Sequence, residues 1–423
     1  MCKKTIFAVL LGLVCCPVFP LTLNECYSLA KENYPAIKQY DLISKSRNFS
    51  FAAASEGWIP KITVEGSVSY MSNVPTLPQG LVNSLGTGVT YQGMNQFQYL
   101  LTADITQTLF DGGVSQSKKQ QARLRQEELV KEADVQFYAL NNQINELYFA
   151  LLLLEEQLNL NTELVTLLQE NVDRVRLMLD EGVVMPSDVN AIEAEVLIAK
   201  QGRVQVESSL KAYKSMLEMI IGKEVTELEV PQMPLQASGV NNRPELDLFD
   251  LRIQSAETAN DLAQSISAPK IALFAKAFYG NVGLDLFDNM INRGMKFNYF
   301  GGVSVKWNVD NIFRKNGARK GMLIEKEGIE LEKELFLFNS SMLSMEQQNL
   351  IDSKRLLLEQ DMEIIKLRKE VRLSSEKKLE NGVADISELI QCIAQENSAR
   401  TSAAQHRIEL VKHLYELKAI NNN

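Results

Sequence analysis

The sequence predicts a mixed α and β fold in which one structural plan is used twice. Three observations predict it: the chain aligns with itself, each copy contains a very long helical pattern, and each copy contains two short segments of alternating polarity. The 423 residues are 45% hydrophobic and 23% charged, which is typical of a folded protein. We therefore treat the chain as two related halves.

Composition excludes several classes of function. A net charge of −9 and the lack of a dense basic stripe argue against nucleic-acid binding. The chain has only two histidines, His406 and His413, and no P-loop, GxSxG, HExxH or paired CxxC motif. We expect no enzyme activity, no metal site and no cofactor. Cys26 and Cys392 are predicted to be small apolar side chains in helices.

The N-terminus predicts export from the cytoplasm. Two lysines precede the apolar residues 6–16, a run that suits a signal peptide and is too short to cross a bilayer. We assign residues 1–20 to a signal peptide, while Cys15 and Cys16 leave lipid modification open. The longest later apolar run is seven residues, 148–154. The mature chain is then periplasmic, secreted, or in the outer membrane as strands.

The duplication is marked by short matches in constant order. NYPAI at 33–37 matches NRPEL at 242–246, and WIPKI at 58–62 matches SAPKI at 267–271, both at a shift of 209 residues. Later matches lie at a shift of 200, so nine residues are missing from the second copy. We predict a first repeat over 21–222, a linker or equatorial segment over 223–242, and a second repeat with a C-terminal equatorial end over 243–423.

The first copy predicts a helix, two strands and a long helix, in that order. A helix over 23–54 ends before Pro60, and period-two alternation follows over 61–70. A polar loop over 72–98 leads to a return strand over 101–109. A turn then opens a helix over 114–181, which is roughly 100 Å long at 1.5 Å per residue.

The second copy repeats this order less regularly. We predict a helix over 244–264, strands over 271–280 and 301–309, a turn over 311–318 and a long helix over 318–380. In the first copy, the long helix carries an apolar seam in steps of three or four residues, which is typical of a coiled coil. The seam runs Phe137, Leu140, Ile144, Leu147, Leu151, Leu154, Leu158, Asn161, Val165, Leu168, Val172, Val175 and Leu179.

Four strands with one apolar face raise a closure problem. The smallest membrane barrels have eight strands, and an open sheet edge in lipid leaves backbone groups unpaired. Either the strands form a small soluble sheet on helices, or several copies of the chain pool their strands in a symmetric oligomer. The sequence pattern alone leaves both open.

Each long helix stops at a similar break, LDEGVVMPSDV at 179–189 and LENGVADISEL at 379–389. These breaks, together with LTLNECYSLAKENYPAIK, GWIPKITVEGSVSY and LTADITQTLFDGG, resemble the TolC family of outer membrane efflux proteins. The resemblance covers roughly residues 21–420 and includes the repeat. It implies a homotrimer in which each chain gives four strands to a shared 12-stranded β-barrel in the outer membrane. The coiled-coil-like helices then form an α-helical barrel in the periplasm.

The resemblance also implies a function and partners. Family members are exit ducts that contact a periplasmic adaptor (membrane fusion) protein and, through it, an inner-membrane pump, with outer membrane lipid around the strands. We expect an outer-membrane channel of a tripartite efflux or secretion system. A periplasmic coiled-coil adaptor, or a structural coiled-coil protein without channel activity, is the alternative. The sequence does not identify the cargo.

Site residues are carried over from the family at the two breaks. Gly182 with Val183 and Gly382 with Val383 match the periplasmic tip that contacts the adaptor, where glycine permits a left-handed turn.

Asp188 and Glu388, six residues past each glycine, match acidic positions at the entrance, and Asp385 is a third candidate for the periplasmic gate of the pore. Ala384 stands where some members have an arginine, so no salt-bridge latch is transferred. Asp188 and Glu388 also suit the first turn of a helix, which is the structural alternative.

Overall fold

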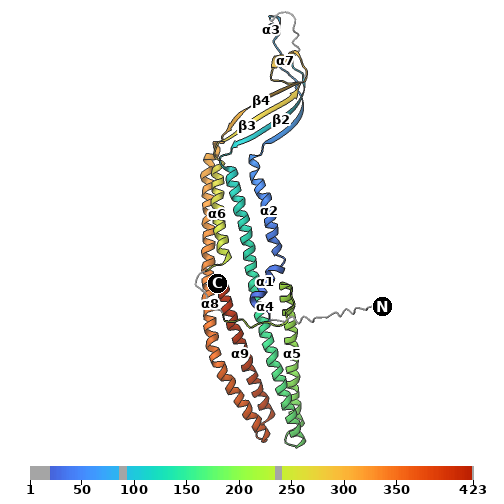
Figure 1. Ribbon diagram of the computed structural model, residues 1–423, viewed down its shortest axis with the longest axis vertical. Coiled ribbons are helices and arrows are strands. Elements are labelled where there is room, and N and C mark those ends of the chain that lie inside the picture. The colour runs from blue at the N-terminus through green and yellow to red at the C-terminus, as the bar shows by residue number, and fades with distance from the viewer. Residues whose placement is uncertain (1–19, 85–92, 234–240, 422–423) are drawn as a thin grey trace, which may run out of the picture. The chain divides into compact units, whose positions relative to one another are not determined.

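The computed structural model describes residues 20–84, 93–233 and 241–421, so nearly all of the predicted signal peptide lies outside the described residues. Over these residues the structure is mostly helical, with one four-stranded sheet (Figure 1). It divides into two units. Unit 1 contains Met1–Tyr40, Glu132–Leu246 and Glu334–Asn423, and unit 2 contains Asp41–Lys131 and Asp247–Lys333. Both predicted repeats contribute to each unit, and the predicted repeat boundaries stay predictions.

The sequence predicts one continuous first helix over 23–54, and this prediction is wrong. The structure has α1 over Leu23–Asn33 and α2 over Ile37–Ser55, with a break at Tyr34. Tyr34 is extended, with ψ of 131°, because the residue before a proline is disfavoured in the helical region. At its other end, α1 begins with a capping box in which Thr22 and Glu25 satisfy each other's backbone N–H groups.

Unit 2 contains the sheet, whose strands are antiparallel in the order β1-β2-β3-β4. Strand β1 covers Lys61–Tyr70, as predicted. The other three overlap their predicted ranges but differ at the ends: β2 is Phe97–Phe110, β3 is Lys270–Gly280 and β4 is Lys296–Lys306. Two short helices that the sequence did not indicate, α3 (Gln79–Ser84) and α7 (Leu286–Ile291), lie in the connections.

Alternation gives the sheet one apolar face. The register pairs Ile62 with Ile105 and Val64 with Ala103 on that face. Its large side chains are exposed in the single chain. They include Ile62, Val64, Val68, Tyr70, Phe97, Tyr99, Leu101, Ile105, Leu109, Phe297, Tyr299, Val303 and Val305.

Five further helices lie in the described part of the chain. The first long helix, α4, covers Val114–Asp180, close to its predicted range, and α5 follows over Pro186–Ile221. Helix α6 covers Pro244–Ser265, α8 covers Asp310–Glu380 and α9 covers Ile386–Asn421 (Figure 1). None of the described helices is apolar enough over a sufficient length to cross a membrane.

The predicted turn over 311–318 is wrong, because α8 is helical from Asp310 onward. Asn316 and Gly317 favour turns locally, yet a glycine within a helix costs only about 1 kcal/mol relative to alanine. Asp310 compensates in part, since an acidic residue in the first turn interacts favourably with the helix dipole.

Unit 1 has two apolar cores. The first joins α1, α4, α5 and α9 around Tyr148, which is fully buried. The Tyr148 hydroxyl lies 2.8 Å from the carbonyl oxygen of Leu21 and 2.6 Å from that of Glu229. Leu21 also forms a parallel bridge with Leu228, so the predicted linker packs against the start of the first repeat here.

The second core joins both helical hairpins of unit 1. It contains Leu168, Val172, Val175, Val189, Ile192, Val196, Ala199, Leu379, Ile386, Leu389 and Ile393. The predicted seam supplies its α4 side. Asn161, the one polar residue in that seam, donates from Nδ2 to the carbonyl oxygen of Ala199 in α5 at 3.1 Å. Gly202 lies beside this amide, and a Cβ at that position would be 3.4 Å from Nδ2.

Candidate functional site

The two breaks in the long helices have the same backbone geometry. Gly182 has φ of +76° and Gly382 has φ of +66°, both in the left-handed region. In the first turn, the N–H of Gly182 donates to Leu179 and the N–H of Val183 donates to Met178, each at 2.9 Å. This pair of bonds is a Schellman motif, which satisfies carbonyl groups at the end of a helix.

The second turn repeats the motif. The N–H of Gly382 donates to Leu379 at 2.9 Å, and the N–H of Val383 donates to Lys378 at 2.8 Å. The shared LxxGV spacing therefore places leucine and glycine at equivalent points of two equivalent turns. Left-handed backbone is easy only for glycine and is tolerated by asparagine, which is the physical reason for glycine at both positions.

The two turns meet in one chain. A Cβ added at Gly382 would lie 3.9 Å from Cγ1 of Val183, so the tip of the α4–α5 hairpin touches the tip of the α8–α9 hairpin. The valine side chains are nevertheless exposed, Val183 by 50% and Val383 by 76%. The second apolar core lies directly behind the tips and includes Leu379 and Ile386. The predicted tip residues therefore lie close together, with the second apolar core packed behind them.

The three acidic candidates flank the same turns. The carboxylate of Asp188 accepts a hydrogen bond from the backbone N–H of Met185 at 2.8 Å, which caps the first turn of α5. Glu388 lies 3.6 Å from the ammonium group of Lys378, the residue that accepts the Schellman bond. Asp385 immediately precedes α9 and is exposed. Among the described residues, no hydrogen bond or ion pair joins Asp188 to Asp385 or Glu388.

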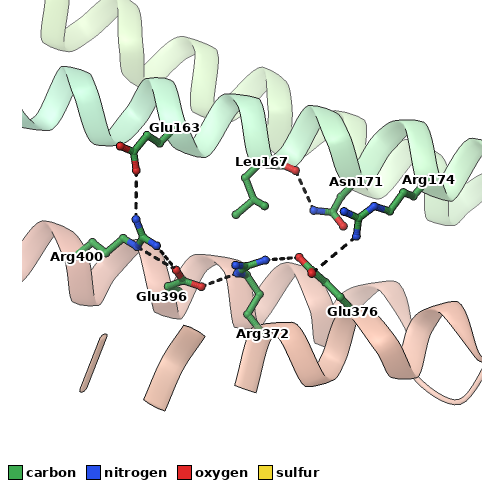
Figure 2. Close-up of polar contacts among 8 residues, drawn as sticks. All are labelled: Glu163, Leu167, Asn171, Arg174, Arg372, Glu376, Glu396 and Arg400. Atoms are coloured by element: carbon green, nitrogen blue, oxygen red, sulfur yellow. Dashed lines mark hydrogen bonds and ion pairs between the residues drawn. The ribbon is translucent and has the colours of Figure 1, made fainter. Parts of the chain in front are cut away.

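Sequence reasoning missed a charged network behind the tips, which Figure 2 shows. Its centre is Glu396 of α9, which accepts from Nε of Arg372 in α8 at 2.5 Å and from Arg400 at 2.6 Å. Arg372 also donates to Glu376, one turn further along α8. Arginine binds two carboxylates well because its planar guanidinium presents several donors.

Two outer contacts extend this network to α4. Arg400 donates to Glu163 at 3.2 Å, and Arg174 lies 3.8 Å from Glu376 (Figure 2). These contacts differ in character from the centre. Glu396 is only 3% exposed and Arg372 only 7%, whereas the side chains of Glu163 and Arg174 are 65% and 45% exposed. Exposed ion pairs contribute about 0–1 kcal/mol, so the buried part holds α8 to α9 more firmly than the outer pairs hold either to α4.

Burial and pairing oppose each other at this site. Burial alone would raise the pKa of Glu396, but the hydrogen bonds from Arg372 and Arg400 outweigh it and hold the pKa below its ordinary value. Burial alone would lower the pKa of Arg372, and the contacts with Glu396 and Glu376 raise it instead. Glu396 and Arg372 are therefore both charged at neutral pH.

The histidines have ordinary partners. Nδ1 of His406 lies 2.8 Å from a carboxylate oxygen of Asp361, and Nδ1 of His413 lies 2.9 Å from the amide oxygen of Gln347. Within the part of the chain that the structure describes, no group of three or more His, Cys, Asp or Glu residues is arranged to hold a metal ion. Cys26 and Cys392 are free thiols inside the helical packing, as the sequence predicts.

Comparison with known proteins gives a consistent result. Residues 26–223 match the family model "Outer membrane efflux protein". A search of curated proteins finds no match. Among solved structures, the CusC channel matches with a TM-score of 0.71 at 13% identity, covering 94% of this chain and 92% of that one.

Two further channels share the fold. VceC from Vibrio cholerae matches with a TM-score of 0.70 at 13% identity, over 94% of this chain and 96% of that one. The CmeC outer membrane channel from Campylobacter jejuni matches with a TM-score of 0.68 at 11% identity, over 94% of this chain and 85% of that one. At these identities the matches show a shared fold.

The predicted fold class and the outer-membrane location are confirmed by these matches. The matched family and folds are those of transport channels rather than enzymes, and such channels are trimers that work with adaptor and pump partners. The family model covers the first repeat, and the shared fold extends over the second. Residues 26–223 thus resemble the outer membrane efflux protein family, and the chain shares the fold of solved outer-membrane channels over 94% of its length.

Proposed function

We propose that three copies of this chain form the outer-membrane exit duct of a tripartite efflux or type I secretion system. The duct passively conducts substrates from a periplasmic adaptor and an inner-membrane pump to the exterior. The observation that carries this proposal is the sheet. Strands β1 and β4 are each paired on one side only, and one face carries exposed apolar side chains. An open sheet of this kind is unstable in lipid.

A trimer accounts for both the unpaired edges of β1 and β4 and the exposed apolar face. Three copies of a four-stranded sheet supply 12 strands, and pairing β4 of one copy with β1 of the next leaves no free edge. The apolar face then contacts lipid. The opposite face, which carries Thr63, Glu65, Thr102 and Asp104, lines the channel. Asp104 and Lys276 form an ion pair at 3.4 Å across β2 and β3 on this polar face.

The adaptor contact is proposed at the hairpin tips. Val183 and Val383 are exposed apolar residues on rigid Schellman turns, and Gly182 and Gly382 leave the backbone beside them uncovered. Three chains present six such tips. Exposed apolar side chains on a well-packed turn are typical of a surface that contacts another protein. Inner-membrane pump contact is then indirect, through the adaptor.

The gate is proposed at the carboxylates that flank the tips. Asp188, Asp385 and Glu388 place negative charge beside both turns, and threefold symmetry repeats each of them around the entrance. Rings of carboxylates attract cations and hinder anions. Asp188 keeps its capping role as well, because capping uses one carboxylate oxygen and leaves the charge in place.

The experiment that tests the duct is fractionation with an unheated gel. The expected result is an outer-membrane protein that migrates as an oligomer before boiling and as a single chain afterwards, with a mass below the 47.6 kDa of the full 423 residues because the signal peptide is removed. The purified oligomer should also form channels in planar bilayers. A monomer in the periplasmic fraction, with no channel activity, would contradict the proposal and favour a periplasmic adaptor or a structural coiled-coil protein.

A further inference from the structure

The junction between β4 and α8 carries a basic and aromatic surface that neither the tips nor the gate explains. We define the strand-end patch as Trp307, Phe313, Arg314, Lys315, Arg319 and Lys320. All six residues belong to unit 2 and follow β4 directly. Two features distinguish the patch: large exposed rings, and positive charge that mostly lacks an ion-pair partner among the described residues.

The rings continue the apolar side of the sheet. Val303 and Val305 of β4 are exposed on its apolar face, and Trp307 follows at the same alternation with 54% exposure. Its indole N–H donates to the carbonyl oxygen of Ser267 at 3.1 Å, so the polar atom is satisfied while the ring stays open. Phe313, in the first turn of α8, is 80% exposed. Tryptophan in such a position is typical of the boundary between lipid and water.

The cations follow immediately. Residues 306–320 contain five lysines and arginines and one acidic residue, a net charge of +4 in a chain whose total is −9. Arg314 lies 3.8 Å from Asp310, a weak pair because the guanidinium side chain is 81% exposed. Within the described part of the chain, no acidic side chain forms an ion pair with Lys315, Arg319 or Lys320. The local charge is therefore open to an anionic partner from outside the chain.

Contacts with the preceding turn hold the patch at the strand end. The side-chain amide of Asn311 donates to the carbonyl oxygen of Ile266 at 3.4 Å, and the hydroxyl of Ser267 donates to the backbone oxygen of Asn311 at 3.4 Å. Since Ser267 also binds Trp307, one short turn fixes the ring and the start of α8 together. The cations therefore lie within three helical turns of the last lipid-facing strand residues.

We infer that the strand-end patch binds acidic phospholipid headgroups in the leaflet of the outer membrane that faces the periplasm. The strands leave the membrane on this side, because β4 continues into the long helix α8. Arginine and lysine bind phosphate through charge-assisted hydrogen bonds, and the neighbouring rings bury in the glycerol and upper acyl region. This inference rests on the outer-membrane location and does not depend on the proposed tips or gate.

The position of the strand-end patch favours a lipid over an anionic cargo inside the channel. Trp307 lies on the apolar side of the sheet, opposite the polar face of Thr63, Glu65 and Asp104. Phe313 and Lys320 are seven residues apart and so share one face of α8, which couples a ring to a cation as a headgroup site requires.

The test uses the full-length protein in detergent micelles that contain phosphatidylethanolamine, with and without phosphatidylglycerol. Wild type should retain phosphatidylglycerol preferentially in native mass spectrometry, with the preference falling as salt rises. Arg319→Gln with Lys320→Gln should reduce the preference by about fivefold for each charge removed. The matched control is Lys366→Gln with Lys369→Gln, which removes two exposed charges later in α8 and should leave the preference unchanged.

Three outcomes overturn the inference. The first is an unchanged phosphatidylglycerol preference in the Arg319/Lys320 variant. The second is displacement of the lipid by free glycerol phosphate at the same concentration, which indicates a phosphate site rather than a lipid site. The third is altered ion selectivity of the channel with unaltered lipid retention, which indicates a cargo contact. If the variant fails to assemble, the salt dependence of wild-type retention decides. Loss of the oligomer on an unheated gel reports separately on the proposed duct.

Discussion

Glu396 of α9 and Arg372 of α8 form a buried ion pair in which Nε and the carboxylate are 2.5 Å apart. Breaking a buried ion pair costs about 3–5 kcal/mol, and the lower end applies here because Arg372 keeps its contact with Glu376 when Glu396 is removed. We predict that Glu396→Gln lowers the stability of the helical unit by about that amount. Thermal unfolding of the detergent-solubilised protein, followed by circular dichroism, measures the loss. Glu370→Gln, an exposed residue of α8, is the control and should change stability by less than about 0.5 kcal/mol.

The same carboxylate gives stability a dependence on pH. The pKa of Glu396 is lowered in the folded state despite burial, which alone would raise it. Its contribution is therefore fully present above the unfolded pKa of about 4.3 and is lost as pH falls through the lower folded pKa. We expect the melting temperature of wild type to fall on acidification below about pH 4.3, and to fall less steeply in Glu396→Gln. Equal slopes in the two proteins would show that Glu396 contributes nothing to acid sensitivity.

The left-handed turns predict a residue-specific cost. Gly182→Ala and Gly382→Ala should each destabilise the protein by about 1–2 kcal/mol, because an L side chain is disfavoured at positive φ. Asparagine tolerates this region, so Gly182→Asn should cost less than Gly182→Ala. At Gly182 nothing lies within 4 Å of an added Cβ, so any cost there comes from the backbone rather than from a clash. Thermal unfolding decides, and equal stability of the alanine and asparagine variants would contradict the argument.

The exposed valines predict where the adaptor binds. Val183→Asp with Val383→Asp places a charge on each apolar knob of the tip without disturbing a buried side chain. We expect the amount of adaptor that co-purifies with the native duct to fall by tenfold or more, corresponding to about 1.4 kcal/mol. The control is Met362→Asp, an exposed residue of α8 outside the tips. Unchanged co-purification from a variant that still forms the oligomer would remove the tips from the proposed interface.

The sequence predicts β1 well because the alternation of polar and apolar residues in a strand depends only on residues that are close in sequence. The alternation over β1 is complete, so Lys61–Tyr70 could be predicted to the residue. The start of α8 could not, because Asn316 and Gly317 favour a turn and the helix continues through them. Pro35 is the sequence signal for the break at Tyr34. The apolar periodicity on both sides of it nevertheless predicts one continuous helix, so the break was missed.

The charged network needed tertiary information. Arg372 with Glu376, and Glu396 with Arg400, are spaced four residues apart and look like ordinary solvent-exposed helix pairs. Their burial arises only because α9 folds back on α8 and brings residues 24 apart in sequence into contact. The turn glycines, in contrast, could be found from sequence because each one satisfies a local backbone demand.

The last prediction concerns the proposed gate. Its variants must remove the charge of Asp188 without removing the hydrogen bond that caps α5. Asp188→Asn keeps a side-chain acceptor for the N–H of Met185, so α5 should stay capped while the charge is lost. Combined with Glu388→Gln, it removes a carboxylate beside each turn, and we expect weaker block by divalent cations in single-channel recordings. Glu370→Gln on α8 serves as the charge control and should leave block unchanged. If block and conductance of the double variant equal those of wild type, Asp188 and Glu388 act only at the helix starts, and Asp385 becomes the remaining acidic candidate at the tip.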